Sequence, residues 1–384
     1  MLAVAATGGY LCFIPFATNP DLATFLLICL GLFAVNQAKA LRPNLQHWDY
    51  LVITAVLFSA SFSALLSPDV FRGLDYIVYL SINLLLLLIA SAFQGKGEVK
   101  AVALCVGLFG LAHLAILLIA SLSPDVSDAS SLVYRAGLAT LIVPNDALIL
   151  GLCFPSLAFV LMAKDRPRTT LALVPMAVYA GLAIYACYLL QSKVALLSVL
   201  TAIFTMAAAR LLLPYRSALK PAFTIGLLVV GILLAGGLAW HLGNQSTVRL
   251  SLWIEAAGAH STLTGILFGA GPNSFVFNPS AAGPLFDNGD LIIPWVHNLY
   301  LEAWHDQGLL GLLAVCALTF LPVQRALRIE DRGIRMLILA SMATFILAAL
   351  FEVTLTRRFY FAFLALFYGL AAGQSKESGN EQRN

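Results

Sequence analysis

Apolar segments of about twenty residues recur from one end of the chain to the other. A helix of that length spans the hydrocarbon core of a bilayer, where only helices and closed barrels satisfy every backbone hydrogen-bonding group. Charged residues make up only 11% of the 384 residues, against about a quarter in soluble domains. We therefore expect an all-α integral membrane protein rather than a soluble, disordered or coiled-coil chain.

The apolar runs predict about twelve transmembrane helices. The first run has no charged leading segment, so we expect it to be a retained span rather than a signal peptide. We expect helices 1–9 in residues 1–242, a long loop in 243–298, helices 10–12 in 299–373 and a disordered cytoplasmic tail in 374–384. The expected spans are 2–18, 20–38, 49–66, 73–94, 99–121, 140–163, 168–190, 193–213, 221–242, 307–323, 333–350 and 357–373.

The distribution of Lys and Arg predicts the orientation. When both termini are placed in the cytoplasm, sixteen of the 22 basic residues fall on the cytoplasmic side, as cytoplasmic loops usually require. The long loop then faces away from the cytoplasm. Six cations lie on the side where the insertion rule disfavours them, which suggests that a function retains them there. These six are Arg72, Arg135, Lys193, Arg249, Arg357 and Arg358.

Composition also excludes several classes of protein. The net charge is only +3 and no long basic run exists, which argues against a nucleic-acid partner. The six cysteines lie inside apolar runs and form no CxxC pair. We interpret them as buried small hydrophobes, and we expect neither a disulfide framework nor a metal site.

The loop over residues 243–298 is the only one long enough to fold by itself. Apolar residues recur at helical spacing over 248–257, and the glycines of 268–273 predict a turn. A segment rich in Gly, Pro, Asn and Asp follows, and the chain re-enters the membrane through 294–302. Four of the five tryptophans lie in or beside this loop. Because Trp prefers the membrane interface, we expect the loop to lie along the bilayer surface, where it meets membrane lipids.

The end of this loop resembles the shared motif of bacterial O-antigen ligases and related polymerases. His297-Asn298-Leu299-Tyr300-Leu301-Glu302 is similar to the His-Asn-x-Tyr-Leu stretch of that family, and Gly308-Leu309-Leu310-Gly311 is similar to its Gly-Leu-x-Gly element. Twelve spans and one large periplasmic loop between helices 9 and 10 also match the family architecture. Further matching elements are Arg249 with Trp253, Phe268-Gly269-Ala270-Gly271, and Gly137 with Pro144-Asn145. Ser192-Lys193 departs from the family's usual Ser-Arg pair and lacks the planar fork of arginine.

The resemblance implies an activity. Members of the family transfer a glycan from undecaprenyl diphosphate to an acceptor hydroxyl at the periplasmic face of the bacterial inner membrane. In the ligases the acceptor is a sugar of lipid A-core, and the reaction belongs to lipopolysaccharide biosynthesis. The resemblance implies no cofactor and no metal ion. Attack by the acceptor hydroxyl in a single displacement predicts inversion at the anomeric carbon.

This chemistry needs a base for the acceptor proton and cations for the leaving diphosphate. His297 is the candidate base, because the ordinary pKa of histidine lies near neutral pH. Arg249 is the main candidate for binding diphosphate and stabilising its charge, together with Lys193. Arg135 and Arg72 are further candidates for the same cradle.

Other polar residues are candidates for binding sugar or for orienting the base. Asn298, Tyr300 and Glu302 belong to the motif, whereas Asn145 and Asp146 lie at the sixth expected span. Each of these residues has a structural alternative. Asn145 and Asp146 suit the start of a helix after a proline, and Arg249 suits a surface helix whose cations reach lipid phosphates.

Two histidine positions have no expected role in catalysis. His260 has no evident partner in the sequence, and we expect His305-Asp306 at the solvated end of the tenth span.

Three alternatives to a ligase remain open. An O-antigen polymerase and a protein O-oligosaccharyltransferase share the motif, although a short tail without an added domain favours a ligase. A transporter of twelve spans is the more distant alternative. We expect few charges inside the spans and no repeated halves, which favours chemistry at one membrane face over transport.

Overall fold

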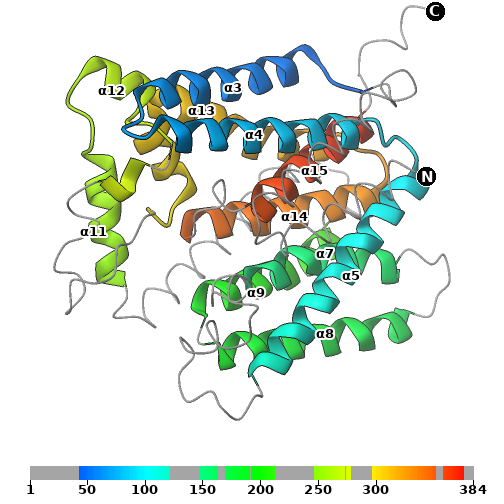
Figure 1. Ribbon diagram of the computed structural model, residues 1–384. Helices are drawn as coiled ribbons and strands as arrows, with labels where there is room; N and C mark the ends of the chain where they lie inside the picture. Colours follow the sequence, from blue (N-terminus) through cyan, green and yellow to red (C-terminus); the bar gives the residue numbers. More distant parts are fainter. Residues whose placement is uncertain are drawn as a thin grey trace, which may run out of the picture.

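The computed structural model describes residues 43–121, 147–162, 169–190, 192–212, 246–272, 274–277, 296–351 and 358–375. Within these ranges the chain is all-helical and contains no strand (Figure 1). The expected spans at 2–18, 20–38 and 221–242 and residues 376–384 of the tail lie outside the described residues. The helices are α3 (His47–Leu66), α4 (Val70–Ser91), α5 (Lys96–Ser121), α7 (Leu148–Met162), α8 (Thr169–Leu189), α9 (Lys193–Leu212), α11 (Ser246–Ala257), α12 (Leu263–Phe268), the short 3₁₀ helix η3 (Ser274–Phe277), α13 (Leu299–Ala326), α14 (Arg332–Phe351) and α15 (Arg358–Gln374).

Five of the described helices are long and apolar enough to cross a membrane. They are α3, α13 and α14, with Gly73–Ser91 of α4 and Lys96–Ile119 of α5. The remaining apolar helices α7, α8, α9 and α15 coincide with four further expected spans but contain shorter apolar stretches. The class of helical membrane protein is therefore supported. The total of twelve spans, the side on which the long loop lies and the type of membrane stay predictions.

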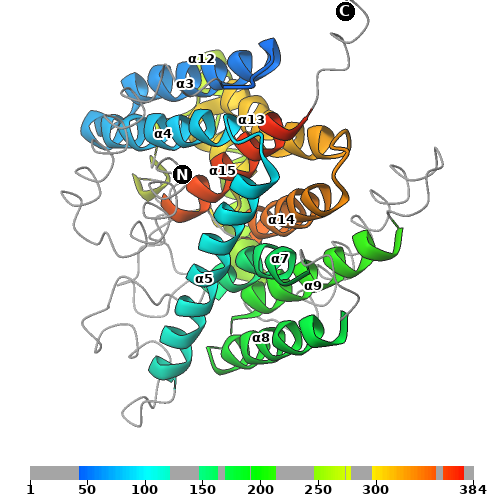
Figure 2. The same cartoon turned by 90° about the vertical axis from the view of Figure 1, so that its right-hand side faces the viewer.

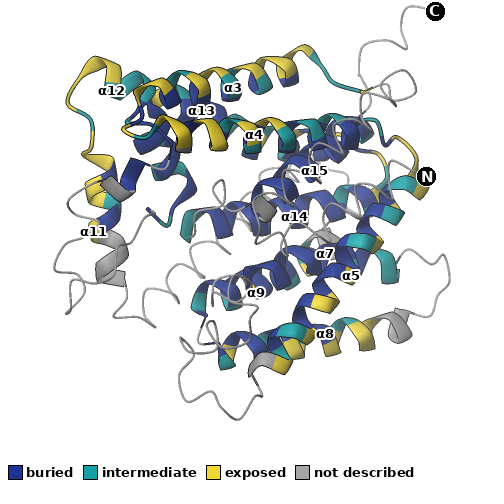
Figure 3. Ribbon diagram, in the orientation of Figure 1, coloured by how far each residue is buried: buried dark blue, intermediate teal, exposed yellow. Residues whose placement is uncertain are grey.

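The helices pack side by side around α14 (Figures 1 and 2). α14 contacts α7, α9, α13 and α15, and 83% of its most apolar stretch is buried. α3 and α8 lie at the edge of the bundle and expose apolar faces (Figure 3). An exposed apolar face on a helix of this length is the arrangement that lipid contact requires.

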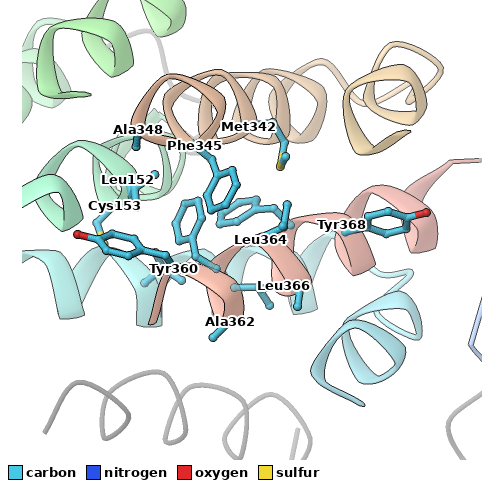
Figure 4. Packing of buried hydrophobic residues seen from close by; sticks show 14 of the residues in the cluster. Leu152, Cys153, Met342, Phe345, Ala348, Tyr360, Ala362, Leu364, Leu366 and Tyr368 are labelled. Carbon is cyan, nitrogen blue, oxygen red and sulfur yellow. The ribbon is translucent and has the colours of Figure 1, made fainter. Parts of the chain in front are cut away.

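Aromatic, aliphatic and small residues pack together in the core. Figure 4 shows Phe345 of α14 and Tyr360 of α15 among buried aliphatic residues of α7, α14 and α15. Small residues permit closer crossings: a Cβ atom added to Gly369 of α15 meets the carbonyl oxygen of Leu87 in α4 at 2.4 Å. Membrane helices approach one another closely through such small residues, because hydrocarbon gives no hydrophobic drive for association.

A buried ion pair ties three helices together at the end of the bundle away from α11 and α12. The Nη2 atom of Arg325, late in α13, lies 2.5 Å from Oδ2 of Asp49 in α3. The hydroxyl of Tyr368 in α15 donates to Oδ1 of the same carboxylate at 2.7 Å, and Gln46 and Ser375 bind the guanidinium. Because both charges are almost fully enclosed and hydrogen-bonded, this network fixes the position of the C-terminal half of α13.

Candidate functional site

The start of α13 is built around Asn298. Its side-chain oxygen accepts hydrogen bonds from the amides of Tyr300 at 3.0 Å and Leu301 at 3.1 Å, and so satisfies two donors that a helix start leaves open. Its Nδ2 donates to the carbonyl of Leu350 at the end of α14, at 3.0 Å. The same side chain therefore begins one helix and attaches it to another.

His297, the candidate base, precedes this cap in a left-handed backbone conformation. Its φ of 55° is the only positive φ at a non-glycine residue in the described part of the chain. The side chain of His297 is partly exposed. A non-glycine residue in this region is held there by its neighbours at some cost in energy, and such outliers concentrate at functional sites.

α13 is broken at Gly308, nine residues after it begins. Gly308 has φ 65° and ψ −160°, a conformation that only glycine adopts readily. Three successive carbonyls before the break accept hydrogen bonds from the loop. Trp304 O lies 3.1 Å from Nε2 of His260, and His305 O and Asp306 O each accept a backbone amide at 2.9 Å. The two amides belong to Ala270 and Gly271. The hydroxyl of Ser63 in α3 also donates to Asp306 O.

Gly269 packs against the backbone of α13 just before its break, and Gly308 packs against the backbone at the end of α12. An added Cβ atom at Gly269 meets the backbone of Asp306 at 2.3 Å, and one at Gly308 meets the backbone of Leu267 at 2.5 Å. The segment Phe268–Gly271 and the break in α13 are thus packed backbone to backbone. No residue with a Cβ atom fits at either position without a shift of main chain.

A cluster of polar side chains is buried on one face of the short first segment of α13. Glu302, His305 and Asp306 are 5%, 4% and 4% exposed, and their spacing places them on one side of the helix. Nδ1 of His305 lies 2.8 Å from Oδ1 of Asp306, and the hydroxyl of Ser274 donates to the same oxygen at 3.4 Å. These contacts join His305, Asp306 and Ser274 in one buried hydrogen-bonded group.

Gln307 extends this cluster toward α3 and α4. Its amide donates to the hydroxyl of Tyr76 at 2.8 Å and accepts from Ser59 at 3.1 Å. The expectation of a solvated His305-Asp306 is wrong, because both residues are buried and find partners in η3, in α3 and in the segment that follows α12. A paired polar group tolerates burial that an isolated one does not.

His260 also has a partner that the sequence did not indicate. Because a carbonyl only accepts, its Nε2 atom donates to Trp304 O, and its ring lies 5.9 Å from that of His305. Burial lowers the pKa of His260, and the nearby imidazole of His305 acts in the same direction, against the backbone hydrogen bonds. His260 is therefore favoured in its neutral form while it holds the break in α13.

α11 reaches the site through Trp253. Its indole Nε1 donates to the carbonyl of Val296 at 3.1 Å, directly before His297. The ring of Trp253 lies 6.2 Å from that of Phe351 at the end of α14. The helix expected from the amphipathic pattern over 248–257 is confirmed as α11, and it is fastened beside the candidate base.

The candidate site residues divide into three groups. His297, Asn298, Tyr300 and Glu302 lie together at the start of α13. Arg72 lies in the first turn of α4, Arg249 in α11 and Lys193 at the first residue of α9, and the side chains of Arg72 and Arg249 are outside the described part. Arg135, Asn145 and Asp146 lie outside the described residues.

Two members of the first group have structural roles. The hydrogen bonds of Asn298 hold the helix start, and the Tyr300 hydroxyl lies 3.5 Å from Oγ1 of Thr319 further along α13. Sugar contacts by these side chains stay predictions. Among the described residues, no group of three or more His, Cys, Asp or Glu side chains is arranged to hold a metal ion.

No protein-family model and no curated protein matches this chain.

Proposed function

We propose that this chain is a membrane glycosyltransferase of the O-antigen ligase type, which transfers a glycan from undecaprenyl diphosphate to a hydroxyl of lipid A-core. One observation carries the proposal. The two segments that resemble the family motif, Phe268–Gly271 and His297–Gly311, lie apart in the sequence but interlock in space through Gly269 and Gly308. A shared site explains why both segments carry the resemblance.

The chain has groups suited to each part of the reaction. His297 takes the acceptor proton while the acceptor oxygen attacks the anomeric carbon, and the bond from that carbon to the diphosphate breaks with its electron pair on the diphosphate. The helix dipole of α13 places partial positive charge near His297, which favours an anion there. Arg249, Lys193, Arg135 and Arg72 are the proposed cations for the diphosphate.

Single displacement gives inversion, and no step in it requires a metal ion. We place the reaction at the periplasmic face of the bacterial inner membrane. An NMR assignment that shows retained anomeric configuration in the product contradicts this mechanism.

The test uses purified protein in detergent with undecaprenyl-diphosphate-linked glycan, lipid A-core, chelator and no nucleotide. His297→Asn is the informative variant, because asparagine tolerates a positive φ better than most residues while it lacks a basic ring. Its matched control is His47→Asn, at an exposed histidine of α3 at the other end of the bundle. Arg249→Ala is paired with Arg328→Ala, an exposed arginine at that same far end.

Transfer to lipid A-core is expected for the native chain and both controls. Loss of a general base typically slows a reaction about 10²- to 10⁴-fold, and we expect a loss of this size in His297→Asn. Longer carrier-linked chains without a lipid A product identify a polymerase instead. Absence of both products from folded native protein refutes the glycosyltransferase proposal.

A second candidate, a transporter, is favoured by one observation. Transporters bind substrates at broken helices and carry buried ionisable residues, and α13 is broken beside Glu302, His305 and Asp306. In such sites the carbonyls at the break coordinate ions. Here the carbonyls of Trp304, His305 and Asp306 accept hydrogen bonds from the protein's own loop. We therefore prefer the enzyme, and substrate uptake into liposomes tests the transporter.

A further inference from the structure

The turn that presents His297 needs support from both sides. Among the described residues it is the one non-glycine position with positive φ, a conformation that persists only where the surroundings impose it. On the side that follows, Asn298 is fixed by the two amides it caps and by the Leu350 carbonyl. The conformation of His297 therefore also depends on what fixes the residue before it, Val296.

Val296 is held on that preceding side by both its side chain and its carbonyl. The side chain is fully buried in a small apolar cluster with Leu252 and Ala256 of α11 and Phe275 of η3. The carbonyl accepts the indole N–H of Trp253 at 3.1 Å. The hydrogen bond acts on the peptide plane that leads into His297, and it therefore constrains the direction of that plane more directly than packing of the Val296 side chain does.

Trp253 also links the base to the candidate diphosphate ligand. Arg249 precedes it on α11 by four residues, which is about one helical turn. The indole ring lies 6.2 Å from the ring of Phe351 and packs against the apolar cluster that contains Val296. One side chain thus connects the helix that carries Arg249 to the turn that carries His297.

We propose that Trp253 is a positioning residue of this site, whose indole N–H fixes the Val296 carbonyl and thereby holds His297 in its left-handed conformation at a set place relative to α11. The catalytic part of this proposal rests on the proposed function of His297. The structural part does not, because hydrogen exchange measures it without turnover.

The informative variant is Trp253→Phe, which removes the N–H donor and keeps an aromatic ring against Phe351. Its matched control is Trp304→Phe. Trp304, in the first segment of α13, donates its indole N–H to the carbonyl of Ala257 at the end of α11, at 3.3 Å, and this hydrogen bond does not involve Val296, His297 or Asn298. Both variants lose one indole hydrogen bond to a backbone carbonyl, and the lost bond is partly buried in Trp253→Phe and exposed in Trp304→Phe.

The first readout is hydrogen exchange in the peptide that contains the capped amides of Tyr300 and Leu301. Loss of one neutral hydrogen bond is expected to speed exchange there about three- to tenfold in Trp253→Phe, with no change in Trp304→Phe. The second readout is turnover. We expect kcat to fall by a similar factor in Trp253→Phe, with KM for the carrier-linked donor unchanged and a smaller fall in Trp304→Phe.

Unchanged exchange in Trp253→Phe overturns the proposal whatever the enzyme activity. Faster exchange with native kcat also overturns it, because the turn then does not limit the reaction. If the native chain transfers no glycan while exchange rises only in Trp253→Phe, the proposed function fails and the hold of Trp253 on the His297 turn is supported.

Discussion

Gly308→Ala tests whether the break in α13 is required by the fold. An alanine in an unbroken helix normally stabilises it relative to glycine. At Gly308 the opposite is expected, since φ 65° and ψ −160° are open only to glycine and an added Cβ atom lies 2.5 Å from the backbone of Leu267 and Phe268. The variant must either keep the break under strain or straighten the helix and push α12 away.

The magnitude follows from these two terms. A residue forced into a glycine-only conformation costs about 1–3 kcal/mol, and an extra methyl group in a filled space costs about 1–3 kcal/mol more. The sum is about 2–6 kcal/mol. At about 2 °C per kcal/mol, the low end for large chains, the melting temperature is expected to fall by about 4–12 °C.

The assay is thermal unfolding in detergent, with Gly181→Ala as the matched control. Gly181 lies in α8, and no atom lies within 4 Å of its added Cβ. That variant is expected to be neutral or to gain up to about 1 kcal/mol. If Gly308→Ala melts at the native temperature while Gly181→Ala behaves as expected, the break does not constrain the fold and the interlock with Gly269 is not structural.

Three further predictions concern the same bundle. Arg325→Met leaves the Asp49 carboxylate buried without its cation and is expected to cost about 3–5 kcal/mol, measured as a lower melting temperature; the double variant with Asp49→Asn should cost less than the sum of the two single changes. Burial lowers the pKa of His260 from its ordinary 6.5, so on acidification the unfolded chain takes up a proton at this imidazole before the folded chain does. The contribution of His260 to stability is therefore present above about pH 6.5 and is lost as the pH falls below that value. In His260→Gln, the melting temperature should fall less on acidification than it does in the native chain. Asn298→Ala removes a helix cap worth about 0.5–2 kcal/mol, and faster hydrogen exchange at the following amides should report it, whereas native exchange rates contradict the capping role.

Length and hydropathy were sufficient to predict most of the described helices. Nine of the expected spans have a helix in the described residues, because a long apolar run has one stable form in lipid whatever its neighbours are. The helix α11 and the glycine turn at Gly269 also follow from local patterns. These features depend on residues close together in the sequence, which explains why the sequence alone predicts them.

The break in α13 was not predicted, although its signals are in the sequence. The apolar run predicts a span that begins at residue 307, whereas the helix begins at Leu299 and breaks at Gly308. Glu302, His305 and Asp306 share one helix face, a pattern that also suits a solvated end. These side chains are buried because Ala270, Gly271 and Ser63, which belong to other segments, pack against this part of α13 and donate hydrogen bonds to it. Local sequence patterns carry no information about such distant partners.

The two polar networks act on opposite halves of α13. At one end Arg325 is fixed by Asp49, so the long second segment is tied to α3 and α15. At the other end the break at Gly308 separates the short first segment from that anchor. The orientation of His297 is therefore set mainly by contacts of the first segment with the loop, with α11 and with the Leu350 carbonyl of α14, and the second segment adds the contact of Thr319 with Tyr300. It follows that substitutions at Trp253 and at Gly269 should affect the His297 turn more than equally destabilising changes near Arg325, even though both sets of residues contact the same helix.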